Sequence, residues 1–106
     1  MTQDEGLLIA VEIWHGQRWA ELAAEGIFMD LSPRSANRSK NSASIDFNTP
    51  SQLASAVFWD SGESEISTAS YFDREEPKVR VHHVGSANEV EALLDQFLIE
   101  LRGLSG

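Results

Sequence analysis

In residues 43–68, ASIDFNTPSQLASAVFWDSGESEIST, the spacing of apolar residues changes from a helical period to a period of two, which predicts a β-sheet. Ala43, Ile45 and Phe47 alternate with polar side chains, and Pro50 ends this first run. Apolar residues at every second position are typical of a β-strand that buries one face. We therefore predict a strand over this run.

Residues 53–59 form the second run, which is apolar on both faces. Strands of this kind are usually covered on both sides, so the pattern predicts a central strand between two layers. The following DSG, residues 60–62, is a tight-turn signal. Glu63 and Glu65 then lie on the polar face of a returning strand. Short turns join antiparallel neighbours, so these strands form a meander.

Two further runs extend the predicted sheet. Residues 27–31 form a short apolar strand, and residues 32–41 form a loop that holds three of the eight basic side chains. Residues 78–84 alternate again after a polar turn closed by Pro77. The sheet is therefore expected to have four or five antiparallel strands.

His82 and His83 are adjacent in the last predicted strand. Neighbouring side chains of a strand point to opposite faces, so this pair cannot chelate one ion, and we expect no metal site. His83 follows Val79 and Val81 in the alternation, which predicts that its side chain is half-buried.

A helix is predicted at each end of the sheet. Residues 6–25 show helical apolar spacing, with Gly26 as the C-terminal cap and a possible bend at His15-Gly16. Ser86 and Glu89 form a capping box before a second helix that ends at Gly103. The two helices are expected to pack on the sheet through Val11, Trp14, Val90, Leu94, Phe97 and Leu101. The fold class is α+β.

Composition restricts the function further. The 106 residues carry 17 acidic and 8 basic side chains, a net charge of −9, and no cysteine. We assign residues 1–106 to a single domain. Without cysteine, disulfides, iron–sulfur clusters and thiol nucleophiles are excluded. The charge argues against direct binding of nucleic acid or a membrane surface. The acidic N-terminus is unlike a secretory signal, and we expect a cytoplasmic protein.

The sequence contains no pattern typical of nucleophilic catalysis or of nucleotide binding. No serine lies in a Gly-x-Ser-x-Gly elbow, and no glycine-rich loop follows a strand to hold phosphate. We expect no catalytic residue and no cofactor.

Carboxylates gather between residues 60 and 76, and three interpretations of them remain open. They form a solvated acidic edge, a binding face for a cationic protein, or the acid and base of a small hydrolase. So short a chain leaves little room for a substrate cleft. The candidate partner surface consists of Trp59, Asp60, Glu63, Glu65, Asp73, Glu75 and Glu76.

The segment SIDF at 44–47, followed by VFWDSGESEI at 57–66, resembles TriTu-type immunity proteins of contact-dependent toxin systems. That family has an aspartate-containing strand, a strand ending in Trp-x-Ser-Gly, and an acidic return strand. A strand with His and a capped helix follow, as VHHV at 81–84 and residues 86–101 do here. Imm1-like immunity proteins have a similar hairpin.

The resemblance implies a non-enzymatic protein that neutralises the C-terminal domain of a contact-delivered toxin in the cytoplasm. Such toxins are often nucleases, which are basic where they hold phosphate, and an acidic inhibitor complements them. The implied partner is a basic nuclease domain, bound by a monomer or weak dimer. The alternatives are a small acidic chaperone or ligand-binding domain of a secretion system, and a carboxylate-dependent hydrolase.

Overall fold

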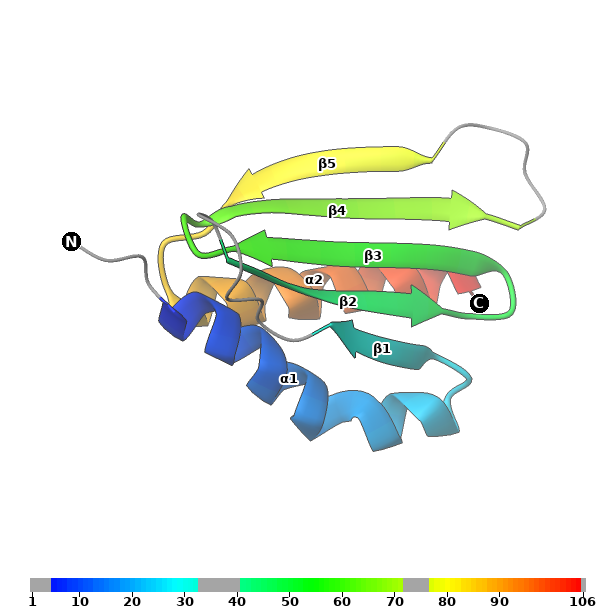
Figure 1. Cartoon of the computed structure of the whole chain (residues 1–106). Coiled ribbons are helices and arrows are strands. Elements are labelled where there is room, and N and C mark those ends of the chain that lie inside the picture. The colour runs from blue at the N-terminus through cyan, green and yellow to red at the C-terminus, as the bar shows by residue number, and fades with distance from the viewer. Residues whose placement is uncertain (1–4, 33–40, 72–76, 106) are drawn as a thin grey trace.

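The computed structural model describes residues 5–32, 41–71 and 77–105. These residues form two helices and five strands (Figure 1). In chain order the elements are α1 (Glu5–Ala24), β1 (Phe28–Ser32), β2 (Ser42–Asn48), β3 (Gln52–Trp59), β4 (Glu63–Ser70), β5 (Lys78–His83) and α2 (Ala87–Ser105). The predicted α+β class is confirmed.

The sheet is an antiparallel meander in the order β1-β2-β3-β4-β5. Each strand pairs with the next strand in the chain, as the short turns predicted. The β3–β4 turn depends on Gly62, which has a φ of 98°. Its N–H donates to the Trp59 carbonyl at 2.9 Å, and its own carbonyl accepts from the Val84 N–H at 2.8 Å. A side chain at Gly62 would strike the Val84 carbonyl, so only glycine fits there.

Both helices lie on the same side of the sheet (Figure 1). The prediction that β3 is covered on both sides is therefore wrong. Ala54, Ala56 and Phe58 face the helices and are buried, whereas Leu53 on the other side is 47% exposed. The helices share one side because their apolar stripes pack on one another as well as on the sheet.

Three aromatic rings from three elements form the centre of the core. The Trp14 ring of α1 lies edge-on to Phe47 of β2, with the centroids 6.2 Å apart. Phe47 packs in the same way on Phe97 of α2 at 5.4 Å. Edge-to-face pairs add about 0.5–1.5 kcal/mol to the burial of their area. The predicted helix contacts are confirmed, since the following side chains are at most 1% exposed: Val11, Trp14, Val90, Leu94, Phe97 and Leu101.

The helix ends differ in part from the prediction. Gly26 caps α1 with a φ of 86°, as expected. The helix continues without a break through His15-Gly16, because Trp14 and Leu22 bury the stripe on both sides of that point. At the other end of the chain, α2 runs past Gly103 to Ser105, so Gly103 is not its cap.

The predicted capping box at the start of α2 is present with one shift. The Ser86 hydroxyl accepts the Glu89 N–H at 3.2 Å, as expected. The Glu89 carboxylate accepts the N–H of Gly85 at 2.6 Å, one residue before the expected position. The box still satisfies backbone donors before the first turn of the helix.

The burial predicted for His83 is wrong. His83 is exposed, and its neighbours Val79 and Val81 on the same face are 55% and 73% exposed. His83 does lie on the same face of β5 as Val79 and Val81, as the alternation predicts, but this face points away from the helices. His82 lies on the helix side, so the two imidazoles do point to opposite faces.

We predict that Leu94→Ala lowers the free energy of unfolding by about 2–5 kcal/mol, because Leu94 is fully buried. The matched control is Ile99→Ala on the same helix, where the side chain is 62% exposed and the change should stay within about 0.5 kcal/mol. Urea unfolding followed by circular dichroism measures both. Equal effects of the two substitutions would contradict the packing described above.

Candidate functional site

The side of the sheet opposite the helices forms a broad surface of strand side chains, called here the open face. It combines large apolar side chains with carboxylates. The most exposed apolar members are Val81 at 73%, Phe28 at 59%, Val79 at 55%, Tyr71 at 52% and Leu53 at 47%. Several large apolar side chains exposed on one face of a sheet make that face a candidate interaction surface.

Two aromatic residues extend over this face. Trp59 lies on it beside Ser42 of β2 and is half-buried. Tyr71 follows β4, and its hydroxyl donates to the Asn48 side chain of β2 at 2.7 Å. This bond carries the Tyr71 ring across β3. Tryptophan and tyrosine are the side chains that most often anchor protein interfaces.

The charged side chains that the structure describes on the open face are all acidic. Register and alternation place four carboxylates on it: Asp30, Asp46, Glu63 and Glu65. In the described ranges, every lysine and arginine lies elsewhere: Arg18 pairs with Asp95, Arg80 with Glu100 and Arg102 with Glu25, while Lys78 stands opposite Thr68 on the helix side. The Glu25 hydrogen bond raises the pKa of Arg102.

Asp30 and Asp46 are direct cross-strand partners between β1 and β2. Both side chains are exposed, and among the described residues neither has a hydrogen-bond or ion-pair partner. Like charges placed directly opposite in an antiparallel pair are destabilising. Among the described residues, no cation offsets this pair of like charges on the open face.

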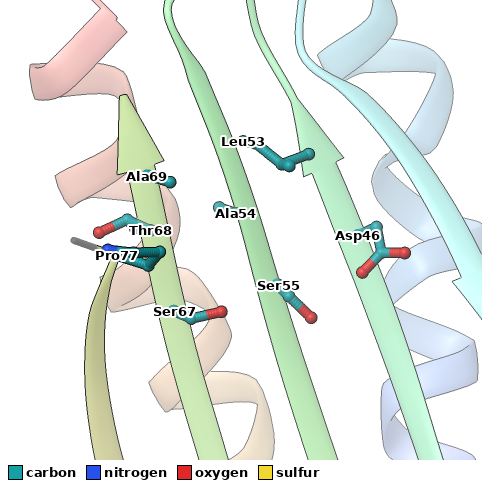
Figure 2. Close-up of a pocket in the computed structure, with 8 residues that line it drawn as sticks. All are labelled: Asp46, Leu53, Ala54, Ser55, Ser67, Thr68, Ala69 and Pro77. Carbon is teal, nitrogen blue, oxygen red and sulfur yellow. The ribbon is translucent and has the colours of Figure 1, made fainter. Parts of the chain in front are cut away.

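A shallow hollow lies beside this pair, over β3 and β4 (Figure 2). It forms because Ser55, Ser67 and Ala69 are small, while Leu53 stands beside them. Its volume is about 250 Å³. It is lined by Asp46, Leu53, Ala54, Ser55, Ser67, Thr68, Ala69 and Pro77.

The structure brings part of the sequence-predicted partner surface together. Trp59, Glu63 and Glu65 all lie on the open face, and Glu65 stands opposite both Val57 and Val81. Asp73, Glu75 and Glu76 lie outside the described residues. The pair Asp30 and Asp46 was not anticipated, because its position depends on the register of β1 with β2.

Asp60 points to the other side of the sheet and is only 3% exposed. Its carboxylate accepts the N–H of Asn41 at 3.2 Å, and its own N–H donates to the Asn41 carbonyl at 3.0 Å. These bonds hold the residue before β2 against the β3–β4 turn. Asp60 thus stabilises the fold through its hydrogen bonds with Asn41, and its side chain presents little surface to a partner.

The polar groups on the covered side do not form a reaction centre in the described chain. Ser64 and His82 are cross-strand partners, but Ser64 is fully buried, and neither the Ser64 hydroxyl nor His82 Nε2 has a hydrogen-bond partner. A nucleophile and its base need such a bond and access to substrate. Within the described ranges, no group of three metal-binding side chains is assembled. None of the described helices is long and apolar enough to span a membrane.

In the described ranges, an antiparallel sheet with both helices on one side and an apolar and acidic open face on the other defines an α+β domain with a candidate interaction surface. The family model of the immunity protein TriTu matches residues 10–100, from the first helix to the last. The chain belongs to the TriTu immunity protein family, which confirms the resemblance seen in the sequence. Neither the curated proteins nor the solved structures yielded a match.

We predict that Asp60→Ala destabilises the protein by about 1–3 kcal/mol, because it leaves the Asn41 N–H with no carboxylate acceptor. The matched control is Glu65→Ala, which removes an exposed carboxylate and should change stability by about 0.5 kcal/mol or less. Thermal unfolding compares the two variants. A neutral Asp60→Ala would contradict the structural role of this carboxylate.

Proposed function

We propose that this protein neutralises a cognate toxin domain in the cytoplasm of the producing cell by covering it with the open face. Membership of an immunity family supports the class of partner. The single observation that supports the surface is the open face itself, which combines exposed apolar area with four carboxylates and lacks lysine and arginine in the described chain. The protein acts by binding and catalyses no reaction.

The chemistry of this face favours a basic nuclease as the toxin. A nuclease holds phosphates with several lysine and arginine side chains. Glu63 and Glu65 are two residues apart on β4, so their carboxylates lie on the same face of the sheet. Together with the net charge of −9, they attract a cationic groove and speed its association. Trp59 and Tyr71 supply the apolar anchors that slow dissociation.

The alternative functions have weaker support. The hollow of about 250 Å³ is smaller than the roughly 300–1,000 Å³ of typical small-molecule sites, which argues against a ligand-binding domain. A hydrolase would need carboxylates facing one another across a cleft, whereas Glu63 and Glu65 stand on a flat, exposed strand face. A secretion chaperone shares the acidity, and it is the second candidate that the experiment below must distinguish.

We expect the gene directly upstream to encode a large toxin whose C-terminal domain forms a stable complex with this protein. Co-expression should protect cells from that toxin domain, and the two should co-purify as a one-to-one complex. A chaperone would instead bind the toxin without abolishing its activity. Binding with retained toxicity, or no binding at all, would refute the proposal.

We further predict that Glu63→Lys with Glu65→Lys slows association with the toxin at least tenfold at low salt, and less at high salt. The physical reason is the reversal of two charges on the open face. The control variant, Glu21→Lys with Glu91→Lys, changes the net charge equally but alters only the helices. Surface plasmon resonance at two ionic strengths measures both rates. The same slowing in the control variant would mean that net charge, and not the open face, controls association.

A further inference from the structure

The hollow on the open face has the composition of a pocket for a cationic side chain. One wall is apolar, formed by Leu53, Ala69 and Pro77. The other end holds the Asp46 carboxylate next to the Ser55 hydroxyl, and Figure 2 shows these two side chains beside one another on neighbouring strands. A long side chain with an apolar stem and a charged end group matches both parts.

We propose, resting on the proposed function, that this hollow receives one arginine side chain of the toxin domain. The stem of the arginine lies along Leu53, and its guanidinium pairs with Asp46 and with Asp30 beyond it. Arginine suits the site because its planar fork has five N–H donors, and two carboxylates with a neighbouring hydroxyl supply several acceptors. The result is a charge-assisted pair in a partly covered site.

Cross-strand register places these groups in one row. Asp30 stands opposite Asp46, Asp46 opposite Ser55, and Ser55 opposite Ser67. The row is polar, and it runs between apolar side chains such as Leu53 and Val57 on the same strand. An arginine laid along it would meet acceptors at its end group and apolar surface at its sides.

The contact between Asp30 and Asp46 favours a ligand over a role in folding. Like charges directly opposite in an antiparallel pair repel one another, and the cations of the described ranges all lie on the helix side of the sheet or on the helices. A bound guanidinium would place one positive charge between the two carboxylates, which offsets their repulsion and attracts the ligand. Removal of the Asp46 charge should therefore leave the free protein as stable or more stable, and should lower its affinity for the toxin.

The volume of the hollow limits the size of the group that can bind in it. At about 250 Å³, the hollow falls below the roughly 300–1,000 Å³ of typical small-molecule sites. It is open along the sheet, since Asp46, Leu53 and Pro77 lie at exposed positions. One side chain of a docked protein fills such a space, and the surrounding contacts exclude water from it.

The deciding variant is Asp46→Asn, which keeps the shape of the side chain and removes its charge. We expect the melting temperature to equal or exceed that of the wild type, and the affinity for the upstream-encoded toxin domain to fall about tenfold or more. The matched control is Glu21→Gln in α1, which removes one exposed charge and should leave the affinity unchanged. Unchanged affinity in Asp46→Asn would overturn the proposal, and so would a loss of stability, because a cation of this same chain would then already neutralise Asp46.

A second probe makes the pocket testable without the toxin. N-acetyl-argininamide should shift the amide signals of Asp46, Ser55 and Ser67 in a saturable way in NMR spectra of the free protein. The uncharged N-acetyl-citrullinamide should not, and Asp46→Asn should abolish the response. No response to the arginine compound would overturn the pocket, whereas a response without toxin binding would leave the pocket intact and refute the proposed function.

Discussion

The edge-to-face packing of Trp14, Phe47 and Phe97 joins both helices to the sheet. These rings come from α1, β2 and α2, and their edge-to-face contacts gather both helices on one side of the sheet. The indole N–H of Trp14 also donates to Asp95 of α2 at 2.9 Å, which ties the two helices together next to the aromatic cluster. Because both helices lie on one side, no described helix or strand covers the other face of the sheet.

This arrangement explains why the open face is available for binding. An uncovered sheet usually carries polar side chains on its outer face, but here Val81, Phe28 and Val79 are all more than half exposed. The opposed carboxylates of Asp30 and Asp46 add a second unfavourable feature to the same surface. Under the proposed function, the toxin domain would bury these apolar side chains and offset the charge of the carboxylates.

Local patterns in the sequence were sufficient to predict the elements but not the layering. The stripe through Val90, Leu94 and Phe97 located α2 and its buried face, since helical period depends only on neighbouring residues. The alternation around Val57 and Phe58 located β3 correctly. Its second apolar face was assigned to a second layer, because no local signal shows that both helices choose the same side of a sheet.

The sequence predicted only part of the candidate site. Trp59, Glu63 and Glu65 were found from the hairpin, and they share the open face. Continuing the alternation from buried Phe58 by two residues would have placed Asp60 on the covered side, where it lies. The pair of Asp30 and Asp46 required the register between β1 and β2, which follows from the assembled sheet and not from either strand.

Methyl cross-saturation in the complex tests directly whether the toxin domain covers the open face. The protein is perdeuterated with protonated methyl groups, the bound toxin domain is fully protonated, and the toxin protons are irradiated. We expect the methyl signals of Leu53, Val57, Val79 and Val81 on the open face to lose intensity, while those of Ile9, Ile13 and Ile99, which are exposed on the helices, are retained. Loss of intensity at the helix methyl groups, with the sheet signals unchanged, would show that the toxin binds the helices and not the open face.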